Sequence, residues 1–592
     1  MPFRALRACA AALLLAPAVP ALAASEAREG APAGLSYRVE IEAPEPLRGV
    51  LAKGLDLVRW QGYAEMSASL LARLAAEARV QAEEAARTEG YFSAVATSTV
   101  EAVQDRAVVR LRVEPGPPTL VTSVELSLSG PAADDPGAAA IAKRIREEWR
   151  LPEGQRFRQS AWDAAKRGAV ATLAEKRFAA AGIARSEARI DPEARTAELF
   201  VELASGPAFR YGAIEARGFA RYSPDIARKV SPVKPGEPYD DDMLALYQRR
   251  LLETGYFATA QVGVDPDPAQ AGAAPVRVTV VEARPRRVEG GVGYSTDTGY
   301  RVTGDYADYD LLGTSWRWRN ELRYEQKIQS FATTFDSPPL EGGAWNSLAA
   351  KALRQDVQNQ IVRQAAVGVS HNWGWEAQWP SYLSLSYHRE DSEVEDVTTR
   401  TRALFLGYRL IHRATDAFLN PRRGLLAALE LGGAPPGVST QGFVRARARV
   451  TGLLPLSPRD DLTARIELGA VGTRSGDTAG VPPTFLFRTG GDDTVRGYAF
   501  QSLGVDVGNA VVGGRYLAVA SVELVHWFAE SWGLGAFVDA GNAADTISGL
   551  KPAVGAGVGA RVRTPIGPLR FDVAYGEQTR QFRIHFSFGY TF

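Results

Sequence analysis

The segment 488–500, R-T-G-G-D-D-T-V-R-G-Y-A-F, has residue types that could hold a fixed charge inside a folded protein. Arg496 stands between Val495 and Gly497, and an arginine keeps its charge at any relevant pH. A buried arginine needs a carboxylate partner, and the glycines let the backbone approach a neighbouring wall closely. The segment predicts either such a buried pair or a solvated surface loop. Asp492 and Asp493 are interpreted as turn formers or local partners.

Few other residues suggest chemistry. The five histidines are scattered without metal-ligand spacing (His371, His388, His412, His526 and His585), so we expect no metal. Neither a nucleotide-binding loop nor a G-x-S-x-G nucleophile motif is present, so we expect no cofactor and no enzyme activity. Lys+Arg and Asp+Glu both number 68, so no overall positive field attracts nucleic acid.

The amino-terminus is typical of an export signal. Arg4 and Arg7 precede an apolar run at 9–18, and Ala21-Leu22-Ala23 fits a cleavage site, so we predict a signal peptide over 1–23. The single cysteine, Cys9, lies within it. Beyond it we find no apolar stretch near the roughly 18 residues that a membrane helix needs. If the exported chain spans a bilayer, it must do so as a closed β-barrel.

Residues 36–285 contain a weak internal repeat. Each unit has a strand, two helices separated by a Pro/Gly turn, a glycine closure and two further strands, with closures at Gly90, Gly182 and Gly255. In the third unit Leu244, Tyr247 and Leu251 form one helical stripe that predicts contact with a sheet. We therefore predict three β-α-α-β-β domains, each with a mixed three-stranded sheet. Their expected bounds are 36–117, 118–206 and 207–285.

From residue 286 the pattern changes to a period of two. Trp316, Trp318, Leu322 and Tyr324 alternate with charged residues, and Val444, Ala446, Ala448 and Val450 alternate with arginines. A soluble sandwich and a membrane barrel both produce this alternation. The export signal, the length and the final strand favour a 16-stranded antiparallel transmembrane barrel over 286–592. In that final strand Phe588, Tyr590 and Phe592 share an apolar face, which resembles the insertion signal of bacterial outer-membrane barrels.

These motifs resemble the outer-membrane assembly factor superfamily that includes BamA, whose repeats are called POTRA domains. The loop signature is carried by six residues: Gly490, Gly491, Val495, Arg496, Gly497 and Tyr498. The sequence F-V-D-A-G at 537–541 is similar to a second family element. Within the superfamily the chain is most similar to TamA proteins, the outer-membrane subunits of the translocation and assembly module. The resemblance implies that Arg496 meets Asp539 on the inner barrel wall, with Glu523 as a second candidate carboxylate.

The resemblance also implies a function and partners. It points to a Gram-negative outer-membrane protein with periplasmic POTRA domains. Its expected partners are nascent outer-membrane proteins such as autotransporters, the lipid bilayer and a TamB-like inner-membrane-anchored protein. Glycines predict a weak seam between the first and last barrel strands (Gly290, Gly291, Gly293 and Gly589). The alternatives are a two-partner secretion pore, a passive channel or receptor, and phospholipid transport to the outer membrane.

Overall fold

The computed structural model describes residues 35–103, 106–373, 379–417, 420–564 and 567–587. The expected signal peptide and the terminal residues Phe588, Gly589, Tyr590 and Phe592 lie outside these ranges. The chain forms two compact units. The first comprises residues up to 205 apart from 174–180, and the second comprises 174–180 and 206–592.

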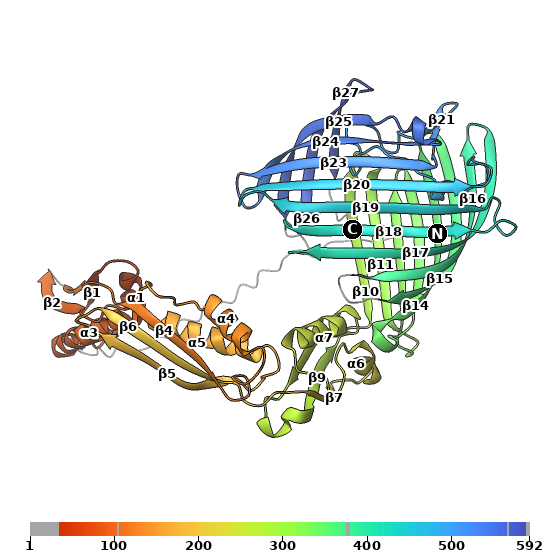
Figure 1. Cartoon of the computed structure of the whole chain (residues 1–592). Coiled ribbons are helices and arrows are strands. Elements are labelled where there is room, and N and C mark those ends of the chain that lie inside the picture. The colour runs from red at the N-terminus through yellow and green to blue at the C-terminus, as the bar shows by residue number, and fades with distance from the viewer. Residues whose placement is uncertain (1–34, 104–105, 374–378, 418–419, 565–566, 588–592) are drawn as a thin grey trace, which may run out of the picture. The chain divides into compact units, whose positions relative to one another are not determined.

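The first unit contains two modules built on three-stranded sheets (Figure 1). In each, the last strand is central and pairs parallel with the first and antiparallel with the second. The first module comprises β1 Tyr37–Glu42, α1 Leu47–Gly54, α2 Asp56–Arg59, α3 Ala68–Thr88, β2 Val95–Val103 and β3 Arg106–Glu114. The second comprises β4 Leu120–Ser129, α4 Ala138–Glu147, α5 Gln159–Ala174, β5 Gly182–Asp191 and β6 Thr196–Ala204.

The third module has the same sheet order and belongs to the second unit. Leu244, Tyr247 and Leu251 are buried against the sheet, as the helical stripe predicted, and Gly255 ends the helix with a φ of 78°. Its elements are β7 Tyr211–Arg217, α6 Asp225–Val230, α7 Asp241–Glu253, β8 Phe257–Val264, the 3-10 helix η1 Pro268–Ala273 and β9 Ala274–Glu282.

The remainder of the second unit is a closed antiparallel barrel of sixteen strands, which confirms the predicted fold class. Neighbouring strands pair in sequence order, except that β23 follows β20 because a long loop intervenes. The first eight strands are β10 Arg286–Ser295, β11 Gly299–Leu311, β12 Trp316–Glu325, β13 Ile328–Asp336, β14 Trp345–Val357, β15 Gln360–Trp373, β16 Ser381–Val394 and β17 Val397–Thr415. The other eight are β18 Gly424–Ala434, β19 Phe443–Pro455, β20 Asp460–Thr473, β23 Tyr516–Trp527, β24 Trp532–Ala544, β25 Ala553–Thr564, β26 Gly567–Gly576 and β27 Gln581–Ser587.

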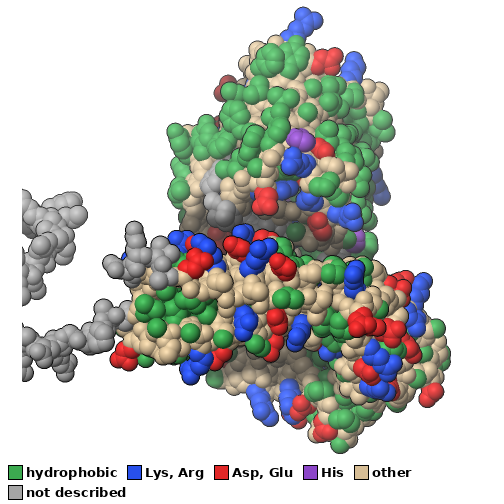
Figure 2. Space-filling view, turned by 90° about the vertical axis from the view of Figure 1, so that its left-hand side faces the viewer, with side chains coloured by type: hydrophobic (Ala, Val, Ile, Leu, Met, Phe, Trp, Pro, Cys, Tyr) green, Lys and Arg blue, Asp and Glu red, His purple; other side chains and the backbone are tan. Residues whose placement is uncertain are grey.

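The two faces of the barrel wall differ in polarity. Leu322 and Tyr324 of β12 point outward and are exposed, whereas Arg317 and Glu325 point inward and are buried. Figure 2 shows hydrophobic side chains covering much of the barrel's outer face. An apolar exterior and an ionic interior suit a lipid-facing wall around a polar lumen. Among the helices of the described ranges, none has the length and apolar character needed to cross a membrane.

The third module contacts one end of the barrel through the turn that follows α7. The Tyr256 hydroxyl donates to the Ser315 carbonyl at 2.7 Å, and Arg317 Nη1 donates to the Thr254 carbonyl at 3.3 Å. Ser315 lies in the turn between β11 and β12, so this is the end at which β10 begins. The loop between β20 and β23 emerges at the opposite end.

Candidate functional site

The candidate site is built from the loop between β20 and β23, which folds back into the barrel lumen. This loop, residues 474–515, contains the 3-10 helix η3 Pro483–Phe485 and a small hairpin of β21 Val505–Val507 and β22 Ala510–Val512. Its central residue, Arg496, is 4% exposed and contacts inward-facing side chains of successive strands. We call residues 490–498 the loop motif.

Arg496 is held chiefly by Asp539 on β24, which is completely buried. Arg496 Nε donates to Asp539 Oδ2 at 2.7 Å and Nη2 donates to Oδ1 at 3.0 Å, which is a bidentate guanidinium–carboxylate pair. The Arg496 backbone N–H also donates to Oδ2, at 3.0 Å. The structure therefore brings together the two residues that the sequence proposed as partners, and it fixes the backbone of the loop as well as the side chain.

Two further carboxylates complete the charge network. Arg496 Nη1 donates to Glu523 Oε2 on β23 at 2.6 Å and to Asp572 Oδ2 on β26 at 3.3 Å. Arg561 of β25 donates to the same two side chains, at 2.8 Å to Glu523 Oε1 and 2.6 Å to Asp572 Oδ1. Two guanidinium groups thus alternate with three carboxylates across four consecutive strands, so each buried charge lies beside an opposite one.

Neutral groups support the same arrangement. The Arg496 guanidinium carbon lies 3.3 Å from the centroid of the Phe537 ring, a cation–π contact from one face. The Ser521 hydroxyl donates to Asp539 Oδ1 at 2.6 Å. Asp539 therefore receives hydrogen bonds on both oxygens, and its carboxylate is fixed in the direction that Arg496 requires.

Glycines allow the loop motif to lie directly on the wall. Gly497 has a φ of 93°, and a Cβ on Gly555 of β25 would lie 1.8 Å from the Arg496 carbonyl oxygen. Only glycine fits that approach. The Tyr498 hydroxyl then donates to the Val554 carbonyl at 3.0 Å. The loop motif is consequently pinned on both sides of Gly497.

The first half of the loop motif forms a tight turn. Gly490 and Gly491 have φ values of 103° and 110°, and the Gly491 N–H donates to the Val495 carbonyl at 3.2 Å. Val495 is fully buried. The Asp492 N–H donates to Asp297 Oδ2 at 2.8 Å, in the turn between β10 and β11. Asp492 thus contacts a residue almost two hundred positions earlier in the chain, whereas the sequence suggested a local role.

A second anchor lies on the other side of the lumen. The Thr484 N–H donates to Glu390 Oε2 of β16 at 3.1 Å, and the Thr484 hydroxyl donates to Glu390 Oε1. Gln364 Nε2 of β15 also donates to Glu390 Oε1, at 2.6 Å. Glu390 is fully buried, so the loop is tied to two well-separated parts of the wall.

The seam between β10 and β27 is described at one end, because residues 588–592 lie outside the described ranges. At that end Ser295 and Ser587 are Cα partners. Beside them the Thr296 N–H donates to the Phe586 carbonyl at 3.2 Å. Of the glycines predicted for the seam, Gly290, Gly291 and Gly293 lie on β10, and Gly589 is outside the described ranges.

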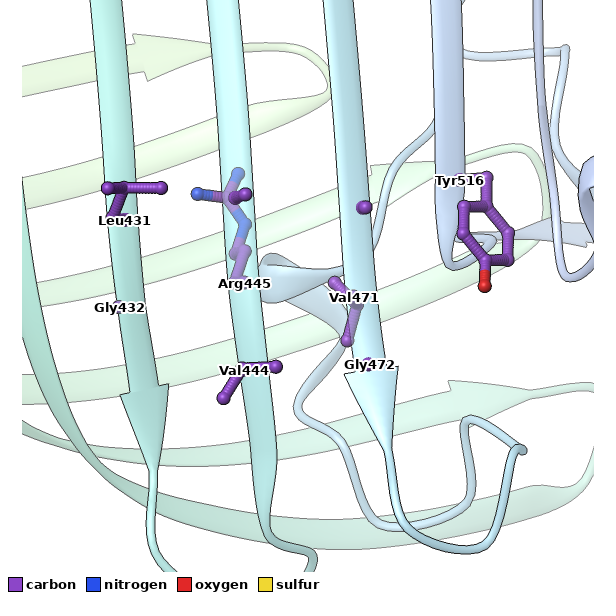
Figure 3. Close-up of a pocket in the computed structure, with 9 residues that line it drawn as sticks. Leu431, Gly432, Val444, Arg445, Val471, Gly472 and Tyr516 are labelled. Carbon is purple, nitrogen blue, oxygen red and sulfur yellow. The ribbon is translucent and has the colours of Figure 1, made fainter.

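A depression of about 440 Å³ lies in another part of the wall. Figure 3 shows Leu431 and Gly432 on β18, Val444 and Arg445 on β19, Val471 and Gly472 on β20, and Tyr516 on β23. Its one charged group, Arg445, already donates to Glu430 Oε2 and to the Phe485 carbonyl. The depression therefore reflects small residues between larger ones and offers no group for chemistry. The described residues also contain no cluster of three potential metal ligands.

Asp572, Arg561, His585 and Glu390 were not singled out as site residues by sequence reasoning. A usable signal existed, because each occupies the polar face of an alternating strand. Strand alternation marks a residue as inward-facing but does not say how high in the barrel it lies, which depends on strand register.

Sixteen antiparallel strands with an apolar exterior, a loop held in a charged lumen and sheet-and-helix modules ahead of them define an outer-membrane β-barrel. Residues 310–592 match the model of the Omp85 superfamily domain, and 209–283 match the POTRA model described as a surface antigen variable number repeat. The carboxy-terminal part of the chain is therefore an Omp85 superfamily domain, and a POTRA domain precedes it. The protein lies in the outer membrane of a Gram-negative bacterium with its POTRA region in the periplasm, as the sequence predicted.

One curated protein and two solved structures are similar to the chain or to its fold. The chain is 25% identical over 378 residues to outer membrane protein assembly factor BamA of Nitratidesulfovibrio vulgaris, covering 60% of this chain and 46% of that protein. It thus spans about half the length of that relative. The fold is similar to the crystal structure of BamA from Haemophilus ducreyi lacking POTRA domains 1–3, with a TM-score of 0.60 and 15% identity over 80% of this chain and all of that one. CdiB from Acinetobacter baumannii gives a TM-score of 0.45 and 16% identity over 80% of this chain and 90% of that one.

Proposed function

We propose that the protein is an outer-membrane assembly factor that promotes the insertion, folding or translocation of other outer-membrane proteins, autotransporters among them. The observation that carries this proposal is the combination of a lipid-facing barrel with three sheet modules ahead of it, in which the outer strands of each sheet are edges. An edge strand with unpaired N–H and C=O groups is a template for another strand. A substrate strand could add there by backbone hydrogen bonds that tolerate many sequences.

The periplasmic region would act on the substrate first. We infer three POTRA domains with bounds 36–117, 118–206 and 207–285, ahead of a barrel at 286–592, because all three modules share one sheet order. Each sheet has its last strand in the centre and therefore presents two edge strands. An unfolded outer-membrane protein in the periplasm could add a strand to such an edge and remain extended until it reaches the barrel.

The finer placement among TamA proteins and the TamB-like partner also belong to this proposal. They are supported by the three modules, which the secretion pores of the superfamily usually do not have, and by the loop motif. The partner would contact the amino-terminal module, which precedes the others in the chain. Photocrosslinkers placed on exposed residues of that module in living cells should capture a TamB-like protein, and consistent absence of such adducts would remove this partner.

A disulfide across the seam tests the assembly function. Ser295→Cys and Ser587→Cys are register partners, and Cα atoms of such partners lie within reach of a disulfide. In a Cys9→Ser background we expect the oxidised protein to lose its ability to insert an autotransporter barrel into vesicles, and reduction to restore it. The matched control joins Leu322→Cys to Phe331→Cys, partners on β12 and β13 away from the seam. Equal activity of the oxidised seam variant and the control would reject the seam as the route of assembly, and failure of the reduced protein and the control to insert the barrel would reject the proposed function.

A further inference from the structure

The loop motif contacts both strands that form the seam. On one side the Asp492 N–H donates to Asp297 Oδ2 at 2.8 Å, in the turn that ends β10. On the other side the Gly497 N–H donates to His585 Nε2 on β27 at 2.9 Å. Asp297 and His585 are 5% and 1% exposed. One short segment of backbone therefore joins the two edges of the barrel from inside the lumen.

The hydrogen bond from Gly497 determines which nitrogen of the neutral His585 ring carries the proton. Because Nε2 accepts a hydrogen bond, the proton of the neutral ring must be on Nδ1. Nδ1 is buried, makes no hydrogen bond to the described residues and lies 3.7 Å from Asp297 Oδ1. His585 of β27 and Asp297, in the turn after β10, thus face each other. Asp297 also accepts the hydrogen bond from the loop motif.

The loop motif is held far more strongly on one side of the seam than on the other. Arg496 is hydrogen-bonded to β23, β24 and β26, which are continuous with β27 through the sheet. Toward β10, the motif is held by the bond from Asp492 N–H to Asp297 and by a longer contact, 3.4 Å, between the Ser295 hydroxyl and Asp492 Oδ2. Beyond the motif, Phe500 and Gln501 accept hydrogen bonds from Gln358 and Gln355 at the end of β14. Within the motif, the contact to Asp297 is the weaker of the two attachments across the seam.

The fit of Gly491 supports a close contact at this point. Its φ is 110°, and a Cβ there would lie 2.4 Å from Asp297 Oδ2. Any side chain at 491 would push the turn between β10 and β11 away from the loop motif. The contact therefore favours glycine at 491 and a side-chain oxygen acceptor at 297.

We propose that residues 491–497 form a latch that holds the seam closed, with Arg496 as its fixed end and the contact between Asp492 and Asp297 as its release point. This inference rests on the proposed function, because it assigns the control of the opening on which that function depends. Opening would leave the latch on the carboxy-terminal strands and free the turn between β10 and β11. Because the charge network keeps the loop motif on the carboxy-terminal strands, β10 would be the edge strand that becomes available to a substrate.

The test measures the seam itself. Spin labels are attached at Tyr300→Cys and Phe582→Cys, both highly exposed, in a Cys9→Ser background. Pulsed electron–electron double resonance in liposomes then measures the distance between the two edges. Asp297→Ala and Gly491→Ala should each broaden the distance distribution and raise the long-distance population roughly tenfold, the effect of losing one hydrogen bond to a charged group. For every variant, heat-modifiable migration on gels shows whether the barrel is folded.

Glu390→Ala is the matched control, because it removes the other anchor of the same loop at a distance from the seam. It should leave the distribution unchanged. The latch is overturned if Asp297→Ala and Gly491→Ala both keep the parent distribution, or if Glu390→Ala broadens it equally. The distance readout does not depend on substrate, so unchanged distances reject the latch even where the protein assembles substrates. Failure of the reduced protein to insert a barrel rejects the assembly function even where the seam moves.

Discussion

The wall formed by β23–β26 and the seam between β10 and β27 are built from the same kind of strand but are held together very differently. Within the wall, adjacent strands share twelve, ten and ten partner pairs, and a buried network of five charged side chains ties them to the loop motif. The loop motif contacts the two sides of the seam through single hydrogen bonds, to Asp297 and to His585. The charge network therefore makes the wall the rigid sector, and the loop motif contacts both regions.

Glycine has opposite consequences in the two regions. In the wall, Gly555 makes room for the backbone of the loop motif, because a Cβ there would lie 1.8 Å from the Arg496 carbonyl oxygen. On β10, a Cβ at Gly290 would meet its nearest atom, the Thr303 carbonyl oxygen, at an ordinary 3.8 Å. Gly555 is therefore required for close packing in the wall. Gly290 has no such packing role, and as a glycine inside a strand it weakens β10.

Removing the central arginine should give the largest effect. Arg496→Ala leaves Asp539, Glu523 and part of Asp572 without their shared cation, and breaking a buried pair typically costs about 3–5 kcal/mol. We expect the urea midpoint for barrel unfolding to fall accordingly and the loop to become sensitive to protease. Arg363→Ala is the control, because Arg363 pairs with Glu393 on a half-exposed surface and should lose about 1 kcal/mol or less. Equal losses in the two variants would show that the wall is not the rigid sector.

Adding a single methyl group at Gly555 should give the next largest effect after removal of Arg496. Gly555→Ala forces the loop motif off the wall, and overpacking of this kind costs about 1–3 kcal/mol. Gly452→Ala on β19 adds the same methyl group where nothing lies within 4 Å, so it should not lower the unfolding midpoint and should raise it slightly. Crystallography of Gly555→Ala should show Arg496 displaced from Asp539. An undisturbed pair would mean that the close approach is not needed to hold the loop motif.

The second anchor should matter less. Glu390→Gln keeps one acceptor for Thr484 and removes the charge, so we expect a loss of about 1–3 kcal/mol in the free energy of unfolding. Hydrogen exchange should increase around residues 483–486 and remain slow around Arg496, because the network of the wall is untouched. Faster exchange throughout the loop would show that the two anchors act as a single unit.

The sequence was informative where the pattern has a fixed period and less so where position depends on register. Alternation, taken with the export signal, the length and the final strand, predicted the barrel and its sixteen strands, and the helical stripe of Leu244, Tyr247 and Leu251 marked a core face. Resemblance suggested Asp539 as the partner of Arg496. Asp572, Arg561 and His585 remained unassigned, because bringing them beside Arg496 requires the pairing of four strands, and slipping one strand by a single residue turns its side chains to the other face. The contact between Asp492 and Asp297 had no local signal at all, because it joins a loop to a turn almost two hundred residues earlier.

The smallest expected change in stability distinguishes the two regions most directly. Gly290→Ala places a methyl group at ordinary contact distance on the outer face of β10, and replacing a strand glycine by alanine stabilises by roughly 0.5–1 kcal/mol. The unfolding midpoint should therefore rise slightly, while insertion of an autotransporter barrel should slow because the edge strand is stiffer. Gly304→Ala, at the register partner of Gly290 on β11, adds the same methyl group one strand further from the seam and should raise stability without slowing assembly. If both variants slow assembly equally, stiffness anywhere in the barrel matters and the seam has no special part; if neither does, the weakness of β10 is not used.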